Sequence, residues 1–202
     1  VGRKDRAMTD KNLWEKVNML GVPLMTPEEN VDVKQTLAEV VKSHDVRMRE
    51  NFPVLLAAVS RKFPVDVSKI MNDFKTASGQ QAFLELLALS SALMEKYSFN
   101  TVNAKKTFDA AAQVYSSFGN YVKSSSGMLS LQDFLTVGDV SLSVQRLELF
   151  FEDFLSRQNQ ETQKMRAKHQ ELSLEFALSQ VFSPRQKELF NKKLNAEILT
   201  KT

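Results

Sequence analysis

Between Ser141 and Phe182 the chain contains no glycine and no proline, and apolar residues recur there at helical spacing. The whole sequence of 202 residues holds only six Gly and five Pro, so few positions favour a tight turn. A fold of many short strands needs many turns, whereas long helices need few. Alternation typical of a half-buried strand is not convincing in any stretch. We therefore predict an all-α fold, in which a multi-helix domain leads into a long, partly exposed helix and a small C-terminal helical element.

Helix start and stop signals divide the first part of the chain. Thr26-Pro27 followed by Glu29 is typical of a helix start, and apolar spacing continues this helix to Phe52-Pro53, where proline interrupts it. Ser124–Gly127 has the composition of a linker. We expect further helices at about residues 9–20, 54–59, 66–75, 79–97, 102–123 and 130–138, with the long helix beginning near residue 141.

The long helix changes character along its length. Apolar residues are dense as far as Leu155, but from Ser156 to Glu171 the only apolar residues are Met165 and Ala167. A helix without an apolar face usually crosses solvent between two bodies. We therefore predict a helical core domain at 9–155, a polar bridging helix at 156–171 and a basic C-terminal element at 172–202. The chain stops as a further helix begins, so we expect that element to be truncated.

Composition excludes several chemistries. Cysteine is absent, which excludes disulfides, thiolate nucleophiles and Cys-based zinc sites, and fits a reducing, cytoplasmic location. No apolar run approaches the roughly 18 residues that span a bilayer, so we expect no membrane partner. Glycine-rich phosphate loops, HExxH, calcium loops and nucleophile elbows are also missing from the sequence. We expect neither a metal nor a cofactor, and no residue is assigned a catalytic role.

Few side chains are candidates for acid–base work. His44 lies among apolar residues on a predicted helix and is interpreted as structural, because its neighbour Asp45 points to another face. His169 lies in the polar span, where we expect it to be solvated. Glu148 and Glu152 share a face at i,i+4 and are interpreted as surface charges beside an apolar stripe. An enzyme or ligand-binding helical bundle remains a remote alternative.

Positive charge gathers at the C-terminal end. From Ser183 to Thr202 five basic residues stand against two acidic ones, so this segment alone equals the formal net charge of +3 of the whole chain. Ser183 and Gln186 form a predicted capping box, and Pro184 takes the first helical position. The candidate nucleic-acid contacts are the basic residues of this segment: Arg185, Lys187, Lys192, Lys193 and Lys201.

The phrase from Phe182 to Phe190, FSPRQKELF, resembles the opening of the helix-turn-helix in sigma-factor region 4 and LuxR-type regulators. Residues 195–200 stand where that family places its turn and second helix, and its recognition helix would follow Thr202. The match covers about twenty residues. It implies that Lys192, Lys193 and Lys201 face phosphates as positioning contacts rather than read bases. A basic terminal helix that only docks or is solvated is the simpler alternative.

Two main hypotheses follow. The first is a non-enzymatic regulatory or adaptor protein that contacts DNA or RNA through its basic C-terminal element. The second is a protein-interaction or assembly module, in which the helix at 142–181 binds a protein partner or a second copy of the chain.

Overall fold

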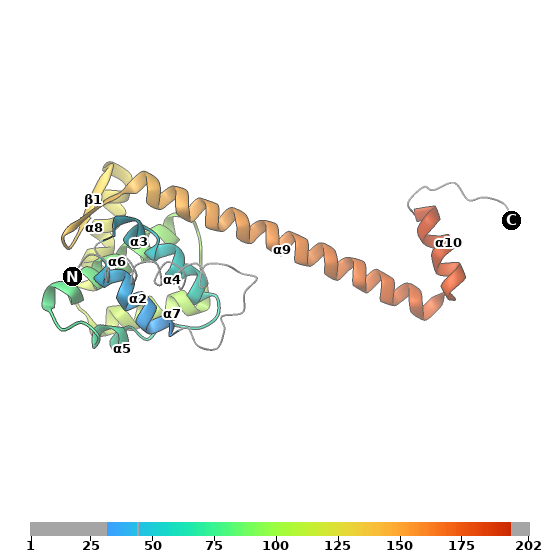
Figure 1. Ribbon diagram of the computed structural model, residues 1–202, viewed down its shortest axis with the longest axis horizontal. Helices are drawn as coiled ribbons and strands as arrows, with labels where there is room; N and C mark the ends of the chain where they lie inside the picture. Colours follow the sequence, from blue (N-terminus) through green and yellow to red (C-terminus); the bar gives the residue numbers. More distant parts are fainter. Residues whose placement is uncertain (1–31, 44, 195–202) are drawn as a thin grey trace, which may run out of the picture. The chain divides into compact units, whose positions relative to one another are not determined.

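The computed structural model describes residues 32–43 and 45–194, and these residues form a mainly helical fold (Figure 1). The chain divides into two compact units, Val1–Phe154 and Leu155–Thr202. The described part of the first unit holds α2 (Val33–Lys42), α3 (Val46–Glu50), α4 (Phe52–Ser60), α5 (Val67–Met71), α6 (Ala77–Lys96), α7 (Val102–Val114) and α8 (Phe118–Leu131). A hairpin of β1 (Phe134–Val137) and β2 (Val140–Ser143) follows, and then α9 (Val144–Val181) and α10 (Pro184–Leu194). The all-α prediction is confirmed, with a small sheet in addition.

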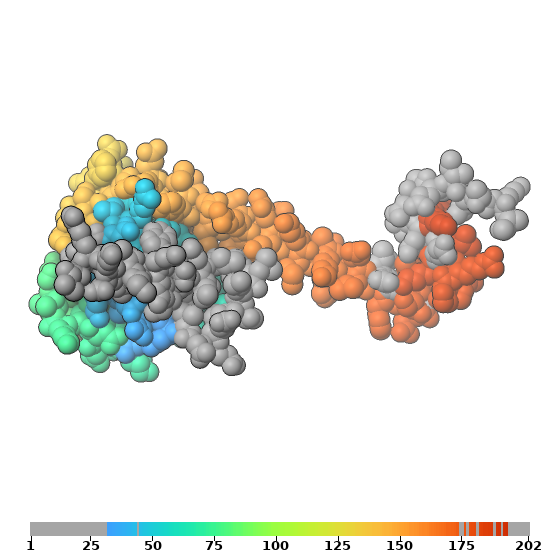
Figure 2. Space-filling view, viewed as in Figure 1, coloured from blue at the N-terminus to red at the C-terminus, as the bar shows by residue number. Residues whose placement is uncertain are grey.

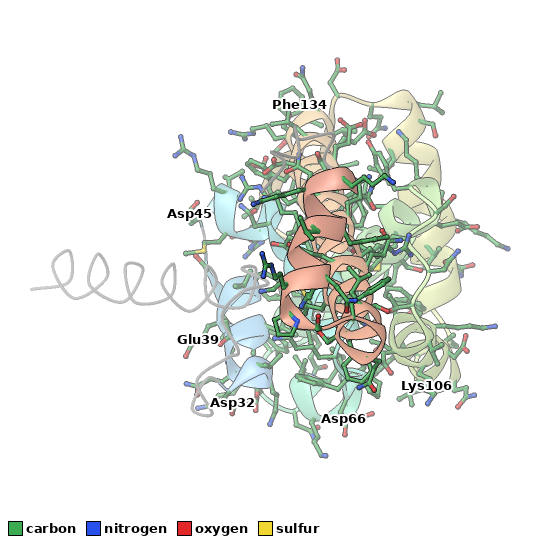
Figure 3. All side chains as sticks on the ribbon, turned by 90° about the vertical axis from the view of Figure 1, so that its right-hand side faces the viewer. Asp32, Glu39, Asp45, Asp66, Lys106 and Phe134 are labelled. Atoms are coloured by element: carbon green, nitrogen blue, oxygen red, sulfur yellow. The ribbon has the colours of Figure 1, made fainter. Side chains whose placement is uncertain are left out.

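Short polar side chains fix where the helices of the first unit begin. Asp32, Asp45 and Asp66, all labelled in Figure 3, accept a backbone N–H from the first turn of α2, α3 and α5. Thr76 and Thr101 do the same for α6 and α7. Each bond satisfies an N–H that has no partner within its own helix. The predicted helices at 66–75 and 79–97 correspond to α5 and α6.

The prediction of one helix from Thr26 to Phe52 is wrong. Ser43 leaves the helical conformation, and the extended residue Asp45 caps a new helix, so α2 and α3 are separate. The predicted break at Phe52-Pro53 is confirmed, since α3 ends at Glu50 and Pro53 lies in the first turn of α4. The start predicted at Thr26, the predicted helix at 9–20 and His44 lie outside the described residues.

The core of the first unit forms around α6, which packs most extensively against α8 and α4. Its 20 residues bury apolar side chains on several faces, including Leu86, Leu87 and Leu93. Phe83 stacks on Phe74 at 5.6 Å between ring centroids and meets Phe52 edge-on at 6.2 Å. This burial around one central helix holds the neighbouring short helices in place.

Two predictions in the middle of the chain are wrong. The single helix predicted at 102–123 is divided, because α7 ends at Val114 and the extended Tyr115 precedes α8. The linker predicted at Ser124–Gly127 is helical and belongs to α8. Serine and glycine favour loops only weakly, and packing of α8 against α6 outweighs that preference.

The short helix predicted at 130–138 is instead a β-hairpin. Leu135 pairs with Leu142, and Val137 with Val140, in an antiparallel register. These four side chains are buried, while Phe134 at the edge labelled in Figure 3 is exposed. Gly138 turns the chain with a φ of +60°, a conformation that glycine adopts without strain. Helix α9 then begins directly at Val144.

The predicted long helix is confirmed as α9, which has 38 residues. Within the first unit its beginning packs on aromatic side chains: Phe151 contacts Tyr97 and Phe99 at ring-centroid distances of 5.6 and 6.0 Å. Nowhere in the described ranges does a helix combine the length and apolar character needed to cross a membrane.

Candidate nucleic-acid interface

The helix start predicted at Ser183-Pro184 is confirmed, and Ser183 and Gln186 interact there. The helix begins at Pro184, and the side-chain oxygen of Gln186 accepts the backbone N–H of Ser183 at 3.0 Å and its hydroxyl at 2.9 Å. This is the return half of a capping box, in which the third helical residue reaches back to the cap. Local sequence therefore sets the start of the element that carries the candidate site.

An aromatic contact within the second unit supports α10. Phe182, just before the helix, stacks on Phe190 at 5.4 Å with an angle of 23° between the rings. Leu178 in the last turns of α9 is also buried. The ring contact therefore holds the residue that precedes α10 against the body of that helix.

The structure divides the predicted contact residues into two groups. Arg185 and Lys193 are exposed, whereas Lys187 and Lys192 are half-buried. Lys187 donates a hydrogen bond to the Ser179 hydroxyl at 3.1 Å and so ties α10 to the end of α9. Arg185 and Lys192 are seven residues apart and share one face of α10. Lys201 lies outside the described residues, as do residues 195–200 of the predicted turn and second helix.

The two units differ in formal net charge. Residues 155–202 contain nine Lys and Arg against five Asp and Glu, whereas residues 1–154 contain 18 against 19. The second unit therefore has a formal charge of +4 and the first of −1. Four exposed basic residues of α9 contribute to this: Arg157, Lys164, Arg166 and Lys168.

The described part of the first unit contains two buried charged residues, Arg49 and Glu50, whose burial the sequence did not predict. On α3, the Arg49 guanidinium donates to the backbone oxygens of Ser43 and Val137, at 2.8 and 3.2 Å, and pairs with Asp139 at 3.1 Å. Adjacent Glu50 accepts the backbone N–H of Ser143 at 2.9 Å. Val137, Asp139 and Ser143 follow α3 by some ninety residues in the sequence. The one signal in the sequence is Gly138-Asp139 between two short apolar runs, which is typical of a hairpin.

The predicted pair Glu148 and Glu152 lies on one face of α9, as expected, and meets the end of α6. Lys96 pairs with Glu148 at 2.5 Å, and the Tyr97 hydroxyl donates to Glu152 at 2.8 Å. Desolvation, reinforced by the hydrogen bond and negative charge of Glu152, raises the pKa of Tyr97 well above its ordinary value of 10.0. The carboxylates therefore hold α9 to α6. His169 is exposed on α9.

The cavities of the first unit offer limited chemistry. One of about 450 Å³ is lined by Arg49, Asp73, Lys75 and Asp139, among others. Both of its carboxylates are in ion pairs: Asp73 with Lys34 at 3.3 Å and Asp139 with Arg49. No cluster of metal-ligating side chains occurs within residues 32–43 and 45–194.

The chain matches no protein family, no curated protein and no solved structure.

Proposed function

We propose that this protein is a non-enzymatic cytoplasmic regulator or adaptor that contacts nucleic acid through its basic second unit. The observation that carries the proposal is the charge of +4 on residues 155–202, against −1 on the rest of the chain. Nucleic-acid affinity arises largely from neutralised phosphates, so a basic helical element beside a near-neutral domain suits this role. The resemblance of FSPRQKELF to a helix-turn-helix opening points in the same direction.

The contacts proposed from α10 are to phosphates. Arg185 and Lys193 are exposed and can reach a backbone without rearrangement of the helix. Lys192 shares a face with Arg185, so the two can contact successive phosphates. Such contacts position a protein on nucleic acid and carry little sequence information, so binding to duplexes of different sequence should be similar.

The test is fluorescence anisotropy of a labelled DNA duplex, and of a labelled RNA of equal length, titrated with the chain across a salt series. Binding should weaken steeply as salt rises. The Lys192→Ala/Lys193→Ala variant should bind more weakly at every salt concentration and reduce the slope of log K against log salt by roughly 2.

The matched control is Lys105→Ala/Lys106→Ala, which removes an adjacent, exposed lysine pair from α7 in the first unit. It makes the same change in net charge, so it should leave binding nearly unchanged. Equal losses in both variants would show a nonspecific response to total charge, and absence of binding at low salt would refute the proposal.

A further inference from the structure

The middle of α9 is a helical segment whose side chains are exposed to solvent. From Thr162 to Ser173 every side chain is exposed, and Figure 2 draws this part of the helix in orange. Helices in proteins draw most of their stability from packing of one face, and an isolated helix is marginal in water. This segment therefore lacks the contact that normally stabilises a helix of its length.

An interrupted apolar stripe nevertheless runs along it. Steps of three and four residues connect Gln158, Thr162, Met165, His169, Leu172 and Phe176. Gln158 is buried, and beyond it Met165, Leu172 and Phe176 are 70%, 56% and 68% exposed. Alternating steps of four and three are the spacing of the seam in a two-stranded coiled coil.

We propose that residues 162–176 of α9 pair with the same segment of a second copy of this chain, parallel and in register. Each of the three exposed apolar side chains then contacts its own equivalent in the second copy. An antiparallel pair that matches Met165 with Phe176 would instead place Leu172 against the polar His169. The parallel arrangement therefore buries more of the stripe.

The charges that flank the stripe also favour pairing with a second copy of this chain. Glu161 immediately precedes Thr162 of the stripe, and Arg166 immediately follows Met165, so they flank the stripe on opposite sides. In a parallel coiled coil, the residue just before the first position of the heptad faces the residue five positions later in the other chain. Glu161 is such a residue, and Arg166 lies five positions after it. Glu161 of each copy therefore meets Arg166 of the other, which gives two equivalent ion pairs. This self-association requires no nucleic acid, so it is independent of the function proposed above.

The first experiment is sedimentation equilibrium of the full chain over a wide concentration range. We expect a reversible monomer–dimer equilibrium, and Leu172→Glu or Phe176→Glu should raise its dissociation constant roughly tenfold or more. Leu149→Glu is the control, because Leu149 is a similarly exposed residue, at 59%, on the opposite face of the same helix. A monomer at several hundred micromolar, or an equal effect of the control, overturns the proposal.

The second experiment fixes the direction of pairing. The chain has no cysteine, so a single introduced thiol can form a disulfide only with another copy. Thr162→Cys lies on the stripe and should cross-link readily in a glutathione redox buffer, because parallel in-register pairing brings the two positions together. Ala167→Cys, on the outer face, should cross-link far less. Equal rates for the two variants, or no disulfide from Thr162→Cys, overturn the parallel register.

Discussion

Glu50 of α3 and Arg146 in the first turn of α9 form an ion pair of 2.9 Å across almost a hundred residues of sequence. The Glu50 side chain is completely buried, and the same oxygen accepts the backbone N–H of Ser143 at the end of β2. Its other oxygen has no hydrogen-bond partner within the described part of the chain. One carboxylate therefore holds the end of the hairpin and the start of α9 against α3.

Removing the positive charge of Arg146 should destabilise the protein. Arg146→Met leaves a buried carboxylate with less compensation, and we expect it to lower the free energy of unfolding by about 2 kcal/mol. In that background Glu50→Gln should restore part of the stability, because it removes the buried charge while keeping the acceptor for Ser143. Urea unfolding followed by far-ultraviolet circular dichroism measures both changes, and a further loss in the double variant would contradict the prediction.

Replacing glycine with alanine should have opposite effects on stability at positions 138 and 127. Gly138 has a φ of +60°, and a β-carbon there would lie 3.2 Å from the β-carbon of Ala82, so Gly138→Ala should destabilise the protein by about 1–2 kcal/mol. Gly127 lies within α8 with open space around its missing side chain, so Gly127→Ala should stabilise by about 0.5–1 kcal/mol. Thermal unfolding of the two variants beside the parent protein compares them, and the same sign of shift in both would be inconsistent with this interpretation.

Tyr97 should make the protein sensitive to high pH. Its pKa is raised in the folded state, so the folded protein keeps the phenolic proton while the unfolded chain loses it above its ordinary value of 10.0. The contribution is therefore fully present below about pH 10 and is lost as the pH rises further. Tyr97→Phe keeps the ring contact with Phe151 and should flatten the fall in unfolding free energy between about pH 9.5 and 11.

The control for this prediction is Tyr115→Phe, which makes the same chemical change at another position. Urea unfolding across the pH series compares both variants with the parent protein, and an equal effect in the two would contradict the prediction. If Tyr97→Phe retained the full slope, another group would be responsible for the alkaline loss of stability.

Charge reversal gives a complementation test of the proposed parallel pair. Glu161→Arg and Arg166→Glu should each weaken self-association by roughly tenfold, because each places like charges opposite one another in both ion pairs. An equimolar mixture of the two variants should form a heterodimer, since every Glu then meets an Arg. Sedimentation of the mixture measures this, and Glu171→Arg, on the outer face of α9, should behave as the parent. Failure of the mixture to associate would contradict the register.

Local sequence determined where several elements begin and end. Thr76, Ser183-Pro184 and Phe52-Pro53 act through bonds or steric limits within a few residues, so their effects can be predicted without the fold. The long helix could be predicted for the same reason, because its spacing continues without a breaking residue from Val144 to Val181. The basic residues of α10 were equally visible, and the structure added which of them are exposed and that Lys187 binds Ser179.

Only the tertiary structure decided the remainder. The serine-rich stretch of α8 is helical because it packs on α6, which local preference could not show. The four-residue strands of the hairpin are too short for alternation to stand out, and their burial depends on neighbouring elements. Arg49 and Glu50 find partners some ninety residues away, so their role follows from how the chain folds back. Sequence determines interactions between near neighbours, whereas the environment of a buried charge is set by segments that only folding brings together.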